Sequence, residues 1–255
     1  MTANLFNLSG RTALVTGSSA GIGLALARGL AQAGAAVVLN GRGEEKLAAA
    51  VAAMAADGLA VRSRAFDVTD AAAVDAGIDA VERDAGPIDI LVNNAGMTRR
   101  APLETLSVAD WNAVLAADLT SAFLVGRRVA AGMIARRSGK IINICSLMSE
   151  VSRPGTGAYT AAKGGLKMLT RSMAVEWARH NVQANGIGPG YILTELTEPL
   201  AADPKFDAWV RGRTPAGRWG ETADLVGAAV FLASPASDFV NGQILYVDGG
   251  ILAAL

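Results

Sequence analysis

The chain has 255 residues and a formal net charge of zero, since 23 Lys and Arg residues balance 23 Asp and Glu residues. A neutral chain lacks the basic footprint of a nucleic-acid-binding protein, and the first residues lack the basic flank and apolar stretch of a signal peptide. No run approaches the roughly 18 apolar residues of a spanning helix, so we expect a cytoplasmic protein with neither nucleic-acid nor membrane partners.

The single Cys and the single His limit the chemistry that the chain can perform. A disulfide needs two cysteines, and zinc sites usually use several Cys and His ligands, so we expect no disulfide and no metal site. We interpret Cys145 as a buried strand thiol. His180 is interpreted as a residue that stabilises the end of a helix.

Short β-branched runs alternate with longer alanine-rich stretches along the chain. The runs predict seven strands, at residues 12–16, 36–40, 60–66, 88–92, 141–145, 182–187 and 243–247. The stretches between them predict helices that begin near Gly21, Glu44, Asp70, Ser107, Gly157 and Thr222. This alternation predicts an α/β fold: one Rossmann-type, doubly wound parallel sheet of seven strands with helices on both faces.

No linker divides the chain, so residues 1–255 are predicted to form a single domain. One irregular segment, at about 188–220, interrupts the alternation and contains Pro189, Pro199, Pro204 and Pro215. Ligands of parallel sheets bind beyond the carboxyl ends of the strands, and this segment follows such an end. We therefore expect a substrate lid there, with an ordinary surface loop as the alternative.

The first predicted strand leads into a glycine-rich turn and then into a helix. Glycines in such a turn let a pyrophosphate approach the backbone, and the helix that follows presents unpaired N–H groups. The G-x-x-x-G-x-G spacing differs from the commoner G-x-G-x-x-G, and a purely structural turn is the alternative. We predict a phosphate site at Gly17, Ser19, Gly21, Ile22 and Gly23.

The second predicted strand ends without the acidic residue that usually binds the ribose hydroxyls of NAD. Gly41 offers no carboxylate there, and the guanidinium of Arg42 can pair with a 2′-phosphate. NADP(H) is therefore predicted over NAD(H), although Glu44 and Glu45 lie nearby and Arg42 could instead be a solvated residue at a helix start.

Two further strand ends contribute to the same predicted crevice. Asp67 and Val68 follow the third strand, where the Asp67 carboxylate can accept from the amino group of adenine. Asn94, Ala95 and Gly96 follow the fourth strand in a turn of small residues that a ribose and a nicotinamide can approach.

The fifth predicted strand ends at Ser146, and the next helix carries Tyr159 and, four positions later, Lys163. Residues at i and i+4 share a helix face, so we expect the Lys163 ammonium near the Tyr159 phenol. An ammonium and an oxidised nicotinamide both favour an ionised phenol. Tyr159 is therefore predicted to act as general acid in ketone reduction and general base in alcohol oxidation, with Ser146 holding the same oxygen. A surface Tyr–Lys pair is the alternative.

The order of these motifs resembles the short-chain dehydrogenase/reductase family, over nearly the whole chain from Arg11 to residues 247–250. The resemblance implies a Rossmann-type fold, a nicotinamide cofactor, catalysis by Ser146, Tyr159 and Lys163, and a homotetramer. It also implies that a segment lies over the nicotinamide and binds the cofactor through Pro189, Gly190, Ile192 and Thr194.

One position departs from the family pattern. The usual fourth catalytic residue is an Asn in the helix after the fourth strand, and Asp118 stands there in this chain. We assign Asp118 to the catalytic set and expect its carboxylate to favour the charged form of Lys163 more strongly than an amide would.

Narrower resemblances at 140–150, 163–170, 185–191, 214–220 and 236–242 point to the branch of the family that interconverts D-gluconate and 5-keto-D-gluconate. Asp at position 118 is not foreign to that branch. Arg100, at the rim of the predicted crevice, can pair with a sugar-acid carboxylate. Glu150 and Arg153 follow Ser146 and are expected to bind substrate hydroxyls or to pair with each other. The alternative for Arg100 is solvent exposure.

Two other functions fit the same motifs. A 3-oxoacyl thioester reductase, or another sugar or polyol dehydrogenase of the family, shares the whole catalytic set. A nucleotide-binding regulator that has lost catalysis is disfavoured, because Ser146, Tyr159 and Lys163 are all intact.

Overall fold

Seven parallel strands form one sheet in the order β3-β2-β1-β4-β5-β6-β7 in the computed structural model, which describes residues 5–195 and 197–254. The strands are β1 (Thr12–Val15), β2 (Ala36–Gly41), β3 (Val61–Ala65), β4 (Ile90–Asn93), β5 (Gly139–Ile144), β6 (Val182–Pro189) and β7 (Ile244–Val247). Every neighbouring pair is parallel. The predicted fold class is therefore confirmed. The strand order reverses between β1 and β4, which opens a crevice at their carboxyl ends.

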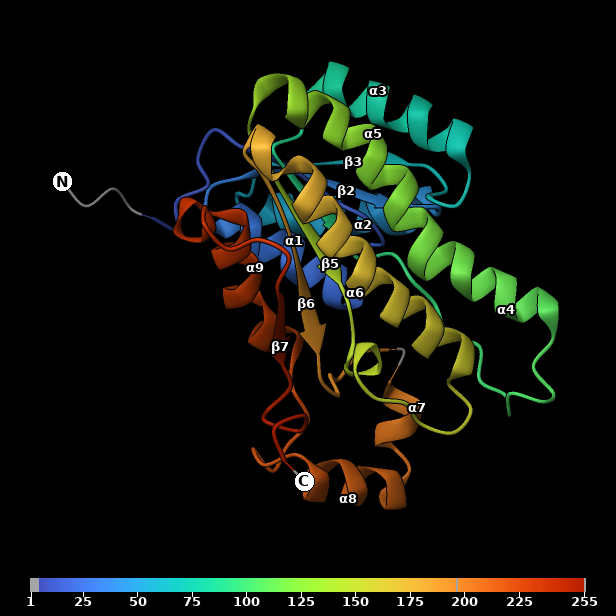
Figure 1. The fold of residues 1–255 in the computed structure, drawn as a ribbon. Helices are drawn as coiled ribbons and strands as arrows, with labels where there is room; N and C mark the ends of the chain where they lie inside the picture. The colour runs from blue at the N-terminus through green and yellow to red at the C-terminus, as the bar shows by residue number, and fades with distance from the viewer. Residues whose placement is uncertain (1–4, 196, 255) are drawn as a thin grey trace.

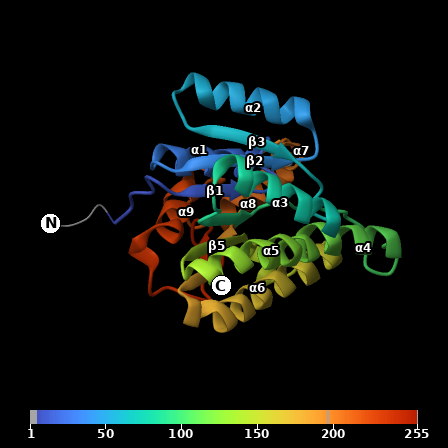
Figure 2. The same ribbon diagram turned by 90° about the horizontal axis from the view of Figure 1, so that it is seen from above.

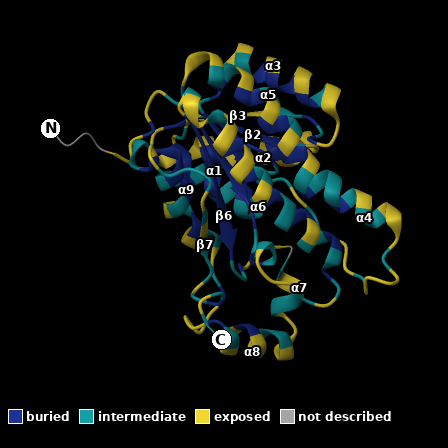
Figure 3. Ribbon diagram, in the orientation of Figure 1, coloured by how far each residue is buried: buried dark blue, intermediate teal, exposed yellow. Residues whose placement is uncertain are grey.

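Helices cover both faces of the sheet (Figures 1 and 2). One face carries α1 (Gly21–Gln32), α2 (Glu44–Ala56) and α9 (Val226–Ala233), and the other carries α3 (Ala71–Ala85), α5 (Ser121–Arg136) and α6 (Gly157–Trp177). Small residues let these helices approach closely: a Cβ on Gly29 of α1 would lie 2.3 Å from Val226 of α9. Figure 3 shows that the buried residues concentrate in the sheet between the two layers.

Short 3₁₀ segments complete the fold at η2 (Leu147–Ser149), η3 (Ala178–His180), η4 (Thr222–Leu225) and η5 (Pro235–Ser237). His180 therefore does end a helical stretch. Its ring Nε2 accepts from Arg179 at the surface.

A long helical rod follows β4 and consists of α4 (Val108–Leu115), a π-helical turn η1 (Ala116–Thr120) and α5. By length and composition Val108–Arg136 is a helix that could cross a membrane. It contains no uninterrupted apolar run of about 18 residues, because Asp118, Arg127 and Arg128 lie within it. The fold covers part of the rod, because α5 packs on α3 and the sheet and α4 packs on α6, while other apolar residues of the rod, among them Val108 and Phe123, are exposed.

The irregular segment between β6 and η4, residues 190–221, is called the insertion segment below. It begins later than the predicted 188, because Gly188 and Pro189 still pair with Tyr246 and Val247 in the sheet. It contains two helices that the sequence analysis did not predict, α7 (Glu198–Ala201) and α8 (Pro204–Arg213). The start of α8 has a recognisable signal, since Asp203 accepts from the first backbone N–H groups and Pro204 follows it.

The two ends of the insertion segment are joined to each other and to the residues that follow β7. Ile192 bridges to Gly220, and the Ala216 N–H donates to Gly249 beyond β7. The indole N–H of Trp219, which is 3% exposed, donates to Asp207 of α8 at 2.8 Å. This bond joins the base of the segment to its outer helix, which lies beyond the carboxyl end of the sheet (Figure 1).

Candidate active site

A cavity of about 400 Å³ opens at the carboxyl ends of the central strands, and the insertion segment forms one of its walls. This volume lies within the ordinary range of small-molecule sites. Most of the predicted site residues line it: Gly17, Gly21, Ile22, Gly23, Asn94, Ala95, Gly96, Arg100, Asp118, Ser146, Arg153, Tyr159, Lys163, Pro189, Gly190, Ile192 and Thr194.

The glycine turn between β1 and α1 forms a cradle without side chains. Gly17 and Gly21 have positive φ values of 61° and 57°, which favour glycine. A Cβ on Gly23 would lie 2.4 Å from the Gly17 carbonyl oxygen, so only glycine fits. The N-cap residue Ala20 makes no side-chain bond to the first N–H groups of α1. These N–H groups can therefore bind an anion such as a pyrophosphate.

Asn94 holds this cradle in place. Its side-chain Nδ2 donates to the carbonyl oxygens of Thr16 at 3.0 Å and Gly17 at 2.9 Å. Because Asn94 follows β4 and the glycine turn follows β1, these two bonds lock neighbouring strand ends together. The insertion segment lies above the cradle, since a Cβ on Gly21 would be 3.9 Å from the Thr194 methyl carbon.

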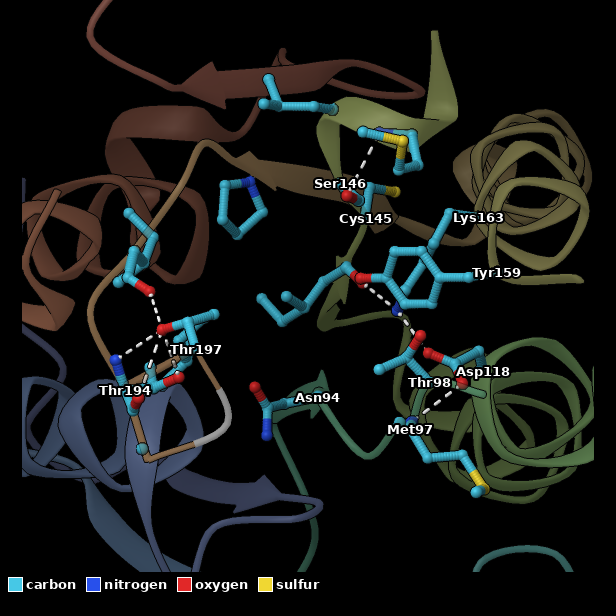
Figure 4. A pocket seen from close by; sticks show the side chains of 18 of the residues that line it. Asn94, Met97, Thr98, Asp118, Cys145, Ser146, Tyr159, Lys163, Thr194 and Thr197 are labelled. Atoms are coloured by element: carbon cyan, nitrogen blue, oxygen red, sulfur yellow. Dashed lines mark hydrogen bonds and ion pairs between the residues drawn. The ribbon is translucent and has the colours of Figure 1, made fainter. Parts of the chain in front are cut away.

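Ser146, Tyr159 and Lys163 lie on one side of the cavity, across from Thr194 and Thr197 (Figure 4). Ser146 lies two residues beyond the end of β5, and its Oγ accepts from the Met148 N–H at 3.1 Å. Lys163 and Tyr159 share a face of α6, with the Lys163 Nζ 5.5 Å from the centre of the phenol ring. The same Nζ donates to the Ile144 carbonyl at 2.8 Å, which fixes the ammonium beneath the cavity.

Asp118 reaches this group from the π-helical turn η1. One carboxylate oxygen, Oδ1, lies 3.2 Å from the Lys163 Nζ, and the other accepts from the Met97 N–H at 2.9 Å. A π-helical turn locally changes the direction of side chains along a helix, and such turns are frequent at functional sites. A Cβ on Gly96 would lie 2.4 Å from Oδ1, so glycine is needed where the carboxylate enters.

Burial dominates the electrostatics of this pair. Burial is the largest single effect and disfavours the Lys163 ammonium, but the neighbouring groups, first among them Asp118, together raise the pKa of Lys163 above its ordinary value. Burial also raises the pKa of Asp118, and the charge of Lys163 and the Met97 N–H offset this effect only in part. Lys163 therefore stays charged at neutral pH.

Cys145 lies next to Ser146 and lines the same cavity. Burial raises the pKa of this thiol to about 11. The thiolate, which is the reactive form, is therefore scarce at neutral pH. Among the described residues no group of three or more His, Cys, Asp or Glu side chains is arranged to hold a metal ion.

A second group of predicted cofactor residues lies outside the cavity, at the ends of β2 and β3. The guanidinium of Arg42 is largely exposed and lies 3.9 Å from the Asp67 carboxylate. Asp67 accepts from the backbone and hydroxyl of Thr69, and these bonds lower its pKa. Val68 is buried. The Ser19 Oγ lies 3.8 Å from where a Cβ on Gly41 would be, so Ser19 faces the end of β2.

The three predicted substrate side chains are not brought together. Arg100 and Arg153 line the cavity, but Glu150 does not. The Glu150 carboxylate instead accepts from Lys167 at 2.5 Å and from the Tyr246 hydroxyl at 2.7 Å. The expected Glu150–Arg153 pair is therefore absent among the described ion pairs, because α6 and β7 supply nearer partners for Glu150.

Several lining residues were not predicted. Tyr191, Thr197 and Leu200 come from the insertion segment, and Met148 and Thr156 come from the loop and turn between β5 and α6. Tyr191 directly follows Gly190 in a segment that the resemblance already pointed to, and this was the signal that could have found it. The other four have no local sequence signal.

A parallel sheet with this strand order and a side-chain-free cradle beyond β1 defines a Rossmann-type dinucleotide-binding protein. The sequence model of the family described as "Enoyl-(Acyl carrier protein) reductase" matches residues 17–252. The chain belongs to this family, which is part of the short-chain dehydrogenases/reductases, and it is an oxidoreductase.

Close relatives cover the full length of the chain. The gluconate 5-dehydrogenase of Gluconobacter oxydans (strain 621H) is 57% identical over 99% of this chain and 98% of its own length. The 2-dehydro-3-deoxy-D-gluconate 5-dehydrogenase of Formosa agariphila is 50% identical over 100% of this chain and 97% of its own length. A crystal structure of a gluconate 5-dehydrogenase from Burkholderia cenocepacia J2315, in complex with NADP and tartrate, is 54% identical with a TM-score of 0.96 and covers 99% of both chains.

Proposed function

We propose that this protein is an NADP(H)-dependent oxidoreductase that interconverts D-gluconate and 5-keto-D-gluconate. The proposal is supported above all by the cavity that Ser146, Tyr159 and Lys163 share with Arg100 and Arg153. The relatives add weight, since two of those described above act at position 5 of six-carbon sugar acids by name.

The chain's own residues fit a nicotinamide dinucleotide. The cradle formed by Gly17, Gly21 and Gly23 would be filled by any Cβ at Gly23, and its N–H groups suit a pyrophosphate. Asn94, Ala95, Gly96, Pro189, Gly190, Ile192 and Thr194 surround the place for the ribose and nicotinamide. At the other end, Arg42 and Ser19 would bind the 2′-phosphate of NADP and Asp67 the adenine amino group. The Burkholderia relative is solved with NADP, which supports this choice.

Tyr159 carries the proton in this proposal. When bound, the nicotinamide supplies a hydride for reduction of the C5 carbonyl or accepts one from the C5 carbinol. In reduction the Tyr159 phenol gives its proton to the carbonyl oxygen, and in oxidation the tyrosinate takes the proton of the C5 hydroxyl. The Ser146 hydroxyl bonds to the same substrate oxygen. The Lys163 ammonium, held by Asp118 and the Ile144 carbonyl, stabilises the tyrosinate.

The two arginines select an acid. None of the ion pairs among the described residues involves Arg100 or Arg153, although both line the cavity. Arg153 is half-buried, whereas Arg100 is exposed at the rim of the cavity, as the alternative for this residue had it. Half-buried cations are normally paired, so an anionic ligand is the expected partner of Arg153, and Arg100 lines the same cavity. The tartrate in the Burkholderia relative is a hydroxy acid, which is consistent with a carboxylate at this end of the cavity.

The insertion segment acts as a substrate lid in this proposal. The cytoplasmic location expected from the sequence and the homotetramer implied by the family resemblance are part of the proposal as well. Arg100, after β4, and Tyr191, at the start of the insertion segment, both line the cavity. A substrate bound between them would be shielded from water, which favours hydride transfer over side reactions.

Loss of NADPH absorbance in the presence of different ketones tests the proposal. We expect 5-keto-D-gluconate to be reduced with the highest kcat/KM, and acetoacetyl thioesters to be poor substrates. Oxidation of 2-dehydro-3-deoxy-D-gluconate in the reverse assay belongs to the same panel. If 2-dehydro-3-deoxy-D-gluconate or a thioester gives the higher kcat/KM, that compound and not gluconate is the substrate. If no carbonyl compound is turned over, the protein is instead a nucleotide-binding regulator.

Arg100→Ala tests the acid contact. A lost charge-assisted hydrogen bond corresponds to roughly a 10- to 100-fold rise in KM for the sugar acid. A change of less than about threefold would remove Arg100 from the substrate site. Arg99→Ala is the matched control, because Arg99 does not line the cavity and pairs with Asp110.

A further inference from the structure

Arg153 has an unusual environment for a cation. It lines the cavity, and its Nη1 is buried without a hydrogen-bond partner. Buried polar atoms in native proteins are almost always paired, and an unpaired charged donor is especially costly. The missing partner of Nη1 is therefore expected to be a ligand of the cavity.

The guanidinium of Arg153 rests on an aromatic ring of the insertion segment. Its central carbon lies 4.6 Å from the ring centre of Phe206 on α8. A guanidinium stacked in this way keeps its in-plane N–H donors free for a planar, bidentate acceptor. Phe206 contacts the face of the guanidinium and does not compete for its N–H donors.

The Phe206 ring is itself held by three other aromatic side chains. It stacks on Trp209 at 5.5 Å between ring centres and meets Tyr191 and Trp219 edge-on at 5.6 and 6.2 Å. Trp219 is anchored to Asp207 by its indole N–H. These contacts fix the position of the Phe206 ring, and through it the position of Arg153 depends on α8.

A second guanidinium, that of Arg100, lines the same cavity. Burial lowers the pKa of Arg100, and the positive charge of Arg153 lowers it further. Two like charges at one end of a cavity repel each other, and an anion placed between them relieves the repulsion. This arrangement favours a carboxylate over an uncharged hydroxyl.

We propose that Phe206 is a positioning residue for acid recognition: it holds Arg153 in the orientation that, together with Arg100, binds the substrate carboxylate. The inference rests on the proposed sugar-acid function and assigns part of substrate selection to the insertion segment. It predicts that Phe206 acts on substrate binding through Arg153 alone and has no role in hydride or proton transfer.

Binding of D-gluconate to the NADPH complex tests this inference without turnover, because the reduced cofactor cannot accept a hydride. The Kd is measured by titration for the wild-type protein, Phe206→Leu, Phe206→Tyr, Arg153→Ala and the double variant Phe206→Leu/Arg153→Ala. We expect Phe206→Leu to raise the Kd by about 5- to 30-fold and Phe206→Tyr, which keeps the aromatic face, to change it by less than about twofold.

The double variant separates positioning from general packing. If Phe206 acts through Arg153, Phe206→Leu adds less than about twofold in the Arg153→Ala background. Phe123→Leu is the control, since Phe123 lies under Arg127 on α5 in a similar pair outside the cavity. Independent, multiplicative effects of the two changes, or failure of Phe206→Tyr to retain binding, would overturn the inference.

Turnover distinguishes this inference from the proposed function. If the wild-type protein binds gluconate with the non-additive pattern but does not oxidise it with NADP, the proposed reaction fails and the inference stands. If it oxidises gluconate and the two changes are additive, the inference fails and the reaction stands. Absence of both binding and turnover rejects both.

Discussion

The Oδ1 of Asp118 lies 3.2 Å from the Nζ of Lys163, and both side chains are almost completely buried. An Asn at this position, which the family resemblance implies as the usual residue, would leave a single positive charge beside Tyr159. Asp118 instead makes the pair neutral overall. The substitution changes the electrostatic field at the proton-transfer site while keeping a hydrogen-bond acceptor in place.

Asp118→Asn is expected to shift the pH–rate profile to lower pH. Asp118 raises the pKa of Lys163, so its removal lets Lys163 lose its proton at a lower pH, and the alkaline limb moves down. At pH values below the alkaline limb, the site of the variant carries one more net positive charge than that of the wild-type protein. This charge stabilises the tyrosinate, so the acid limb of alcohol oxidation also shifts to lower pH. The measurement is kcat/KM for gluconate oxidation against pH.

Asp238→Asn provides the matched control for that experiment. Asp238 pairs with the buried Lys140 at 2.8 Å, outside the cavity. Its loss should lower stability but leave both limbs in place. A profile that is unchanged in Asp118→Asn, or shifted equally in the two variants, would contradict this electrostatic account.

Tyr159→Phe is expected to reduce kcat by roughly 10²- to 10⁴-fold, the usual contribution of a general acid or base, with little change in cofactor binding. Tyr246→Phe serves as control, because Tyr246 binds Glu150 and does not line the cavity. We expect it to retain its kcat. Steady-state kinetics with NADPH and 5-keto-D-gluconate measures both, and comparable losses would assign Tyr159 a structural role.

Arg42→Ala tests the cofactor preference. Loss of a guanidinium–phosphate pair should raise the KM for NADPH by about 10- to 100-fold and leave the KM for NADH nearly unchanged. Arg83→Ala is a suitable control, since Arg83 is exposed and pairs only with its neighbour Asp84. Equal or better use of NADH by the wild-type protein would reject the preference for NADP(H).

Gly23→Ala should weaken cofactor binding by at least about tenfold, because its Cβ would lie 2.4 Å from the Gly17 carbonyl and 2.5 Å from the Asn94 Nδ2. Gly227→Ala, in α9, places a Cβ in open space. It should stabilise the fold by about 0.5–1 kcal/mol through helix propensity. Titration with NADPH and thermal unfolding measure the two effects, and normal NADPH affinity in Gly23→Ala would argue against the cradle.

The predicted homotetramer is open to a direct measurement. Large apolar side chains are exposed on the outer helices, among them Val108, Phe123, Met168 and Val175. Burying such residues between subunits would be favourable. Light scattering coupled to size exclusion should give four times the 26.0 kDa mass of one chain. A monomer at micromolar concentration would contradict the prediction.

The parts of the site that could be predicted from the sequence depend on local geometry. The glycine turn follows a strand and precedes a helix, and Tyr159 and Lys163 are one helical turn apart, so their proximity needs no long-range information. Strand and helix periodicity likewise determined the seven-stranded α/β fold. The two helices of the insertion segment were missed, because α7 is only a single turn and α8 lacks a clear apolar periodicity.

The sequence by itself determined the fold class and which residue types could perform hydride-linked proton transfer, because both follow from short-range patterns. The resemblance already paired Asp118 with Lys163, and the structure places the two 3.2 Å apart. Only the tertiary structure decided the other contacts of the charged side chains: Glu150 pairs with Lys167 and Tyr246, and Arg153 stacks on Phe206. These contacts join residues far apart in the chain, and their energies depend on burial, which no local pattern encodes.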